Sequence, residues 1–524
     1  MSPPPTGAGP HPAEAGTGQP GRFRRRLVLN TASHGAANGW AIVVALVTLP
    51  VLLHCLGPVR YGLWAALQTF SARRGWLAIA DLGLGGAATR SIALRAATGE
   101  KVSTRVVVGT ALATFAVFGI VAGAVLALAG PLVLPTIFHA SAPDRGGMDT
   151  AILFFAMQVP CDLVADGCGD CLSGLQRLDI GRALDAARRT LVAIATISAA
   201  LLGGGLPGVA VASLGATVVA GIAGVVVLSR RVRPALPSVT EARRLLGYGA
   251  AVGAAGAFGI VEGAINRTVV GIITGPVGVT LVDIASQVQS GADAVLASAT
   301  SVVLPGAAWL RARGGDAQLR ELLLRGTRYS LLVSAPVTVG AMVLAGPAID
   351  IWLGGGYHAA VIPAVLALGY VLVAGTIQVA SFELQGVGRA RALIPVYAVT
   401  TVVNLGLTIL LVFWLGPAGA FAASLVTLPL FMFPQLRLAL RELGGGFLEF
   451  LRRGVFPVMM PTALMAAVAA LALQLPTTPI VKLVLGVCAG MLLYCAVALR
   501  WSVSREEIAE LRRLVRARGI AGSP

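Results

Sequence analysis

Charged side chains are scarce in this chain. Asp, Glu, Lys and Arg make up only 12% of its 524 residues, whereas hydrophobic residues make up 56%. A soluble domain carries about 25% charged residues, so this composition excludes an ordinary soluble protein. It predicts an all-α protein that crosses a membrane many times. The net charge of +17 would suit a nucleic-acid-binding protein. However, the basic residues form short clusters between apolar runs, which is typical of topology signals, so we expect no nucleic acid.

The chain also lacks the motifs of common enzymes and metal sites. It has no P-loop, so we do not expect ATP to be the direct energy source. Its one CxxC pair, Cys168 and Cys171, has no second pair and no nearby His, so we expect no metal. The longest loops expected outside the membrane, near 136–149 and 349–358, lack a paired catalytic constellation. This argues against a membrane-embedded glycosyl- or acyltransferase, and we expect a protein that is not an enzyme.

Long apolar runs predict about fourteen transmembrane helices. The expected spans are 30–55, 61–87, 104–128, 150–175, 186–204, 207–229, 248–273, 279–306, 327–348, 359–385, 392–414, 417–436, 455–474 and 479–500. Arginine-rich loops alternate with loops that hold only Arg60, Arg145 and Lys482. Because the positive loops stay on the cytoplasmic side, this alternation predicts that both termini are cytoplasmic.

Short sequence matches suggest an internal repeat. Gly57-Pro58-Val59 recurs as Gly275-Pro276-Val277, and two further matches have a similar offset of roughly 210 residues. The repeat predicts an N-lobe of six spans and a C-lobe of six spans, followed by two extra helices. The expected divisions are a disordered cytoplasmic tail at 1–21, the N-lobe at 22–235, the C-lobe at 236–445, the extra spans at 446–502 and a basic tail at 503–524.

Two blocks of sequence carry a family resemblance. Residues 56–90 begin with LGPVRYG and end with DLGLGGAATR. The second block runs from NRTVVGIITGP at 266–276 through VLP at 303–305 and RGTRY at 325–329 to WLG at 352–354. The chain thereby resembles the Wzx-type polysaccharide flippases of the multidrug/oligosaccharidyl-lipid/polysaccharide exporter superfamily. The resemblance implies two six-helix lobes that form a V around a central cavity, lined chiefly by helices 1, 2, 7 and 8. It also implies a polyprenyl-diphosphate-linked glycan as substrate.

Polar residues within the predicted spans mark the expected cavity. A charge at the bilayer centre costs about 2.5–3.5 kcal/mol on insertion scales, so such residues should face protein or water. Arginine suits a diphosphate because its planar fork donates several hydrogen bonds. The alternative is that these charges form internal ion pairs, such as Arg74 with Asp81 or Arg267 with Glu262. The expected substrate-binding residues are Arg73, Arg74, Asn266, Arg267 and Gln287.

An acidic stripe in the fourth span suggests a second role. Asp162, Asp166 and Asp170 are spaced four residues apart, which places them on one helix face. Such carboxylates must bind a cation, hold protons or pair with basic groups, and pairing is favoured for Asp166. The candidates for coupling or ion pairing are Asp81, Asp162, Asp166, Glu262 and Asp283. We expect no resident cofactor, with coupling to H⁺, Na⁺ or the membrane potential left open.

These observations predict a flippase that moves a polyprenyl-diphosphate-linked oligosaccharide from the cytoplasmic to the outer leaflet by alternating access. Such transport would supply cell-surface polysaccharide synthesis in a bacterial or archaeal cell membrane. Two alternatives in the same superfamily are a lipid II flippase and a cation-coupled multidrug antiporter. The expected partners are membrane lipids and, as candidates, glycosyltransferases or a polymerase, and the protein is expected to be a monomer.

Overall fold

Helices make up almost the whole of the described chain. The computed structural model describes residues 20–72, 75–81, 83–300, 303–312, 315–386, 393–443 and 445–502, and these ranges contain no β-strand. Two predicted site residues, Arg73 and Arg74, lie outside the described residues. So do the predicted tails, except for residues 20–21.

The helices follow one another with short connections. In chain order the elements are α1 (Pro20–Gln68), η1 (Trp76–Asp81), α2 (Leu84–Ala97), α3 (Lys101–Ile137), α4 (Ala142–Gly174), α5 (Leu178–Leu201), α6 (Gly205–Ser229), α7 (Val239–Thr300), α8 (Val303–Ala312), α9 (Asp316–Val343), α10 (Ala345–Leu353), η2 (Gly355–Ala360), α11 (Val361–Gly375), α12 (Gln378–Gly386), α13 (Ile394–Leu415), α14 (Ala418–Leu443), α15 (Phe447–Phe450), η4 (Leu451–Val455), α16 (Phe456–Leu473) and α17 (Pro479–Trp501).

The sequence predicts fourteen spans, but fewer helices of the described chain are long and apolar enough to cross a membrane. Among the described residues, 11 helices are long and apolar enough to cross a membrane, or up to 12 if the bent pair Ala317–Val343 and Ala345–Leu353 is one span. Part of the difference arises because α1 and α7 each contain two predicted spans joined at a sharp bend. The helix α5 is not among the 11. The predicted span 186–204 begins after Arg182, whereas α5 begins at Leu178 and contains Arg182 as well as Arg188 and Arg189.

Glycine followed by proline produces both bends. Gly57 has φ 72° and ψ 168°, and Gly275 has φ 75° and ψ −169°. A positive φ favours glycine, and the proline that follows can begin a new helix because its missing N–H is not needed there. An ion pair of 2.8 Å joins Arg267 to Asp283 across the second bend. In a continuous helix these residues would lie about 24 Å apart along the axis, so the chain folds back at Gly275.

The second predicted span is not one continuous helix. The segment after Gly57 is helical only to Gln68, and the chain then turns before η1 and α2. The backbone N–H of Trp76 donates a hydrogen bond of 2.8 Å to the carbonyl of Thr69, which closes this turn. Hydrophobicity alone predicted an unbroken span over 61–87, and the tertiary fold interrupts it. The break brings Asp81 to the start of α2, where it accepts a bond from the Gly85 N–H.

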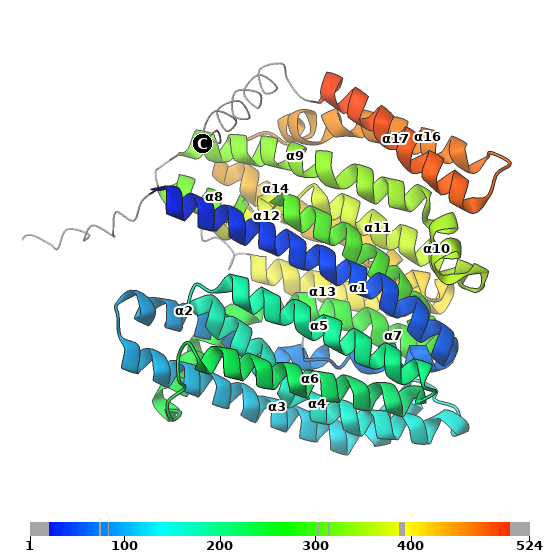
Figure 1. Cartoon of the computed structure of the whole chain (residues 1–524). Coiled ribbons are helices and arrows are strands. Elements are labelled where there is room, and N and C mark those ends of the chain that lie inside the picture. Colours follow the sequence, from blue (N-terminus) through cyan, green and yellow to red (C-terminus); the bar gives the residue numbers. More distant parts are fainter. Residues whose placement is uncertain are drawn as a thin grey trace, which may run out of the picture.

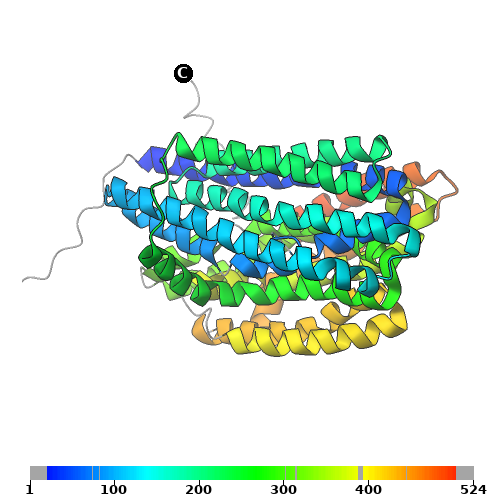
Figure 2. The same ribbon diagram turned by 90° about the horizontal axis from the view of Figure 1, so that it is seen from below.

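The long helices run roughly parallel to one another in two views at right angles (Figures 1 and 2). The helices α3 to α6 pack together in the lower part of Figure 1, and α9, α16 and α17 pack together in the upper part. Between them, α1 packs against α5 and α7, while α7 also packs against α11 and α13. The two bent helices therefore connect the N-terminal half of the molecule, α1 to α6, with the C-terminal half, α7 to α17.

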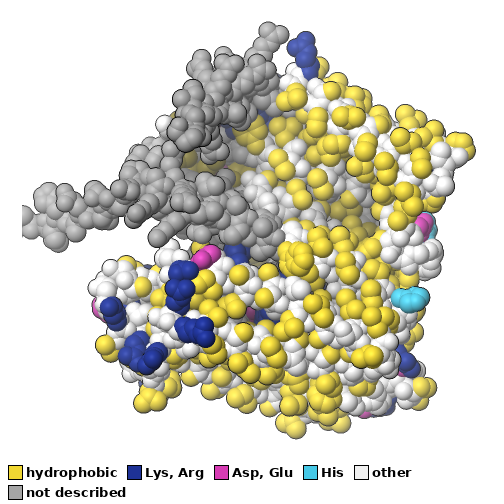
Figure 3. Space-filling model, in the orientation of Figure 1, with side chains coloured by type: hydrophobic (Ala, Val, Ile, Leu, Met, Phe, Trp, Pro, Cys, Tyr) yellow, Lys and Arg dark blue, Asp and Glu magenta, His cyan; other side chains and the backbone are white. Residues whose placement is uncertain are grey.

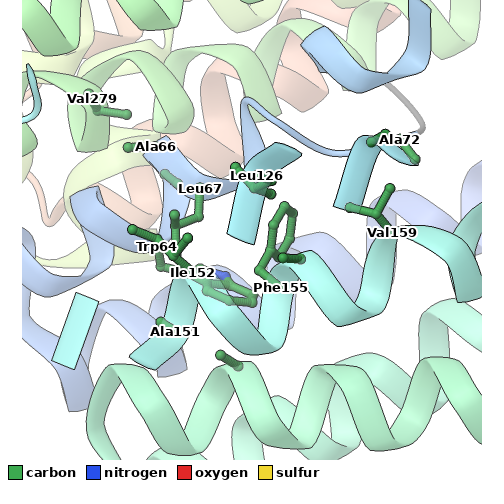
Figure 4. Close-up of a cluster of buried hydrophobic side chains, with 14 of the residues drawn as sticks. Trp64, Ala66, Leu67, Ala72, Leu126, Ala151, Ile152, Phe155, Val159 and Val279 are labelled. Carbon is green, nitrogen blue, oxygen red and sulfur yellow. The ribbon is translucent and has the colours of Figure 1, made fainter. Parts of the chain in front are cut away.

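An aromatic contact fixes the segment after Gly57 against α4. Trp64 and Phe155 meet edge to face, with ring centroids 6.3 Å apart at 83°. Leu67 and Ile152 are fully buried beside them, and Figure 4 shows this cluster between the two segments. Close packing of large side chains holds neighbouring groups in place, so this contact also positions Tyr61, one turn before Trp64.

The surface is mainly apolar, as a bilayer requires. In Figure 3 hydrophobic side chains cover most of the visible flank, whereas Lys and Arg gather toward one end of the lower half. The C-terminal end of α2, with Arg95, and the start of α3, with Lys101, carry basic residues near this end. A multi-pass membrane protein is the architecture that combines these features.

Candidate functional site

A polar cavity of about 380 Å³ lies where α1 and α7 meet α4, α5 and α6. We call it the central cavity. Three arginines and two aspartates line it, so arginines outnumber aspartates in its wall. Such a concentration of charge in a transmembrane bundle is typical of a transport pathway. Its charged and selected polar lining residues are Tyr61, Gln68, Gln158, Asp162, Arg188, Arg189, Arg267, Asp283 and Gln287.

One carboxylate in this cavity joins three segments of the chain. The Asp283 Oδ1 accepts a hydrogen bond of 2.8 Å from Arg267 Nη2, and its Oδ2 accepts one of 2.6 Å from the Tyr61 hydroxyl. Asp283 is only 7% exposed and Tyr61 only 5%. Because both carboxylate oxygens are bonded, the buried charge is well compensated. Tyr61 belongs to the N-terminal half, so this network ties the two halves together.

The two Gly-Pro bends contact each other close to this network. Thr280 donates from its Oγ1 to the carbonyl of Pro58 at 2.7 Å. At the matching position of the other bend, a Cβ on Gly62 would lie 2.0 Å from the carbonyl oxygen of Pro276. Each residue comes four positions after its own proline, so the contact follows the internal repeat. Glycine at position 62 lets the two helices approach this closely.

A buried arginine holds the acidic stripe of α4. The Arg188 side chain, 7% exposed, donates to Asp162 Oδ1 at 3.1 Å and to Asp166 Oδ1 at 2.6 Å. Gln158 donates to the other oxygen of Asp162 at 3.0 Å. The pairing with a basic group that the sequence favoured for Asp166 is therefore present, and it extends to Asp162.

Two further cavities flank the central one. The first, of about 390 Å³, is lined by four aspartates and by Arg182 and Arg188. It contains two of the predicted residues, Asp81 and Asp166. Arg188 lines both this cavity and the central one.

The second flanking cavity, of about 280 Å³, lies on the other side of Arg267 and contains Glu262 and Asn266. The Asn266 amide donates to Ser424 at 3.2 Å, so this residue faces the helix α14. Of the alternatives left open for Arg267, the structure pairs it with Asp283 rather than with Glu262. The predicted residues that the structure describes are thus spread over three cavities, and of these Asp162, Arg267, Asp283 and Gln287 share the central one.

Among the lining residues of the central cavity that the sequence did not predict, Tyr61 and Arg188 hold its aspartates. Tyr61 lies within the LGPVRYG block. It is an ordinary aromatic residue in an apolar span, so nothing in the neighbouring sequence indicates its hydrogen bond to Asp283. Arg188 falls within the predicted span 186–204 but was not among the predicted site residues. The signal that could have found it is the acidic stripe of α4, which needs a cationic partner nearby. Among the described residues, no group of three or more His, Cys, Asp or Glu side chains could hold a metal ion.

Comparisons with known proteins bear on the fold of the chain. A family model described as "Polysaccharide biosynthesis protein" matches residues 183–362. No curated protein sequence matches the chain. A solved structure described as "Lipid II flippase MurJ, inward closed conformation" matches with a TM-score of 0.71 at 12% identity, covering 89% of this chain and 97% of that chain.

A second structure is described as an inward-facing "multidrug resistance MATE family transporter of the MOP superfamily". It matches with a TM-score of 0.57 at 14% identity, covering 80% of this chain and 98% of that chain. An outward-facing MATE structure gives 0.55 at 12% identity, covering 79% and 95%. At these identities the matches establish the fold. They confirm the all-helical fold that the resemblance carried by the two sequence blocks implied.

Proposed function

We propose that the protein is a flippase that moves a polyprenyl-diphosphate-linked oligosaccharide from the cytoplasmic to the outer leaflet by alternating access. The observation that carries this proposal is the central cavity with its excess of arginine, in a chain with a transporter fold. The match of residues 183–362 to a polysaccharide biosynthesis family supports the glycan part of the substrate. A diphosphate is anionic and rich in acceptor oxygens, which suits this lining.

Arg267 is the residue best suited to hold the diphosphate. Its side chain is 24% exposed, and its bond to Asp283 uses Nη2, so other guanidinium donors can face the cavity. Asp283 orients the guanidinium, and Gln287 lies one helical turn after Asp283 on the same face. The polar cavity would carry the glycan, while the lipid tail stays in the bilayer.

Alternating access requires the two halves to separate at one end and meet at the other. We propose that the Tyr61–Asp283–Arg267 network and the contact between the two bends hold one end closed. A diphosphate bound to the other donors of Arg267 would compete with Asp283 for the positive charge of the guanidinium. We therefore propose that substrate binding weakens the network and favours the opening of this end. Coupling of the cycle to H⁺, Na⁺ or the membrane potential is a prediction from the sequence that leaves these three driving forces open.

The test is Arg267→Gln in proteoliposomes that contain a fluorescent lipid-diphosphate oligosaccharide. We expect translocation to fall about tenfold or more, because a charge-assisted hydrogen bond contributes about 1.5–3 kcal/mol and 1.4 kcal/mol is one decade. Arg267→Lys should restore only part of the activity, because lysine lacks the bidentate fork. Wild-type activity in the Arg267→Gln protein would refute the assignment of the diphosphate to this residue.

A matched control separates this effect from the general loss of an ion pair. Arg60 bonds Asp144 at the same 2.8 Å distance but lies outside all three cavities, with a side chain that is 53% exposed. Arg60→Gln should leave translocation unchanged.

A panel of candidate substrates decides between the alternative functions in one experiment. Preference for lipid II over other lipid-linked oligosaccharides, or transport of organic cations alone, would replace the proposed substrate.

A further inference from the structure

A separate pocket lies at the end of α14, away from the central cavity. Its volume is about 340 Å³, roughly ten times the ~30 Å³ that one water molecule occupies, so it can take more than a water or a simple ion. Leu436 and Leu440, both buried, form part of its lining. Phe433 of α14 and Phe447 of α15 also line it, with ring centroids 6.5 Å apart. These two rings are 61% and 49% exposed, so the apolar wall is open to the surroundings.

Two arginines form the polar part of the same pocket. Arg437 and Arg441 lie four residues apart on α14, so they occupy one face of the helix, about 6 Å apart along its axis. No acidic side chain in the described part of the chain pairs with either of them. Glu449, from the following segment, is bound to Arg320 and Arg453 instead. The two positive charges therefore have no counter-ion within the described protein.

This combination defines the chemistry of an occupant. The helix α14 is long and apolar enough to span the bilayer, and the arginines lie in its last two turns, where the hydrocarbon region gives way to headgroups. A ligand here meets exposed aromatic rings over one part and two unpaired guanidinium groups over the other. Basic pockets between transmembrane helices bind anionic lipid headgroups in this manner.

We propose that this pocket binds an anionic phospholipid, with its phosphate between Arg437 and Arg441 and an acyl chain against Phe433 and Phe447. The site lies outside the cavities assigned to transport and does not depend on the proposed substrate. Each arginine near an anionic headgroup favours binding by a factor of about five, so the pair should favour an anionic lipid about thirtyfold.

Photo-crosslinking tests the site directly. The purified full-length protein is irradiated with a phosphatidylglycerol that carries a diazirine in its acyl chain, and labelling of the peptide that spans 433–447 is measured by mass spectrometry. We expect labelling of this peptide to be at least tenfold lower in the Arg437→Gln/Arg441→Gln protein than in the wild type. If the double variant does not fold, each single variant should lose about fivefold. The Phe433→Ala/Phe447→Ala protein should also lose labelling, because the apolar part of the site is removed.

The control variant is Arg230→Gln/Arg231→Gln. These two exposed arginines follow the end of α6 and line none of the pockets described here, so their loss should change labelling of 433–447 less than twofold. Three results would each overturn the proposal. They are unchanged labelling in the Arg437→Gln/Arg441→Gln protein, equal labelling by the matching phosphatidylcholine probe, and complete displacement of the lipid by millimolar inorganic phosphate.

Discussion

The hydrogen bond between Tyr61 and Asp283 joins the two halves of the molecule. A single substitution can remove it while leaving the shape of the buried side chain almost unchanged. Tyr61→Phe deletes only the hydroxyl that donates to Asp283 at 2.6 Å. The ring remains in its buried position, and Asp283 keeps its 2.8 Å bond from Arg267. The substitution therefore weakens the contact between the halves without leaving a buried carboxylate wholly unpaired.

The size of the effect follows from the type of bond. A hydrogen bond to a charged group contributes about 1.5–3 kcal/mol, and the short distance places this one among the charge-assisted bonds. If the bond exists only while this end of the molecule is closed, its loss shifts the equilibrium toward the open conformation by the same free energy. This corresponds to a change of about tenfold to a hundredfold in the ratio of open to closed molecules.

Spin-label distances measure that ratio. Val59 and Val277, which follow the two prolines, are 38% and 42% exposed and can carry labels on introduced cysteines. The six native cysteines are replaced first, since all six are free in the structure. We expect Tyr61→Phe to add or enlarge a population with a longer distance between the two labels.

The control substitution is Tyr494→Phe. The Tyr494 hydroxyl donates to the carbonyl of Leu332 at 2.8 Å, a bond that lies within the C-terminal half and does not cross to the other. It should leave the distance distribution as in the wild type. An unchanged distribution in the Tyr61→Phe protein, or an equal shift in both variants, would refute the role of this bond in holding the halves together.

Two further predictions concern single contacts. Arg188→Gln should lower the melting temperature of the purified protein measurably, because removing one partner of a buried ion pair costs about 3–5 kcal/mol. Adding Asp162→Asn and Asp166→Asn should restore much of the loss, and a melting temperature unaffected by Arg188→Gln would contradict this pairing. Gly62→Ala should lengthen the same label distance, because its Cβ would lie 2.0 Å from the Pro276 carbonyl oxygen. The matched control is Gly86→Ala, which meets nothing within 4 Å, and equal distances in the two variants would count against the close approach at Gly62.

Several features could be predicted from the sequence because they depend on local or average properties. Low charge and long apolar runs predict transmembrane helices, since every backbone group in a bilayer must be bonded within the protein. The Gly57-Pro58 and Gly275-Pro276 pairs mark sharp connections because few other residues adopt their backbone angles. The acidic stripe of α4 indicated a basic partner for Asp166, because unpaired carboxylates in a membrane are costly, but it left cation binding or protonation open for Asp162.

Other features depend on contacts between distant segments, and only the tertiary structure reveals them. The break after Gln68 is held by a turn that hydropathy does not detect. Arg188 carries the same charge as the loop arginines near it, and only the packing of α5 against α4 buries it. Likewise Arg267 could pair with Glu262, five residues earlier in the same helix, or with Asp283 across a bend. The fold decides for Asp283, because reversal of the chain at Gly275 brings that carboxylate, and with it Tyr61 from the other half, to the guanidinium.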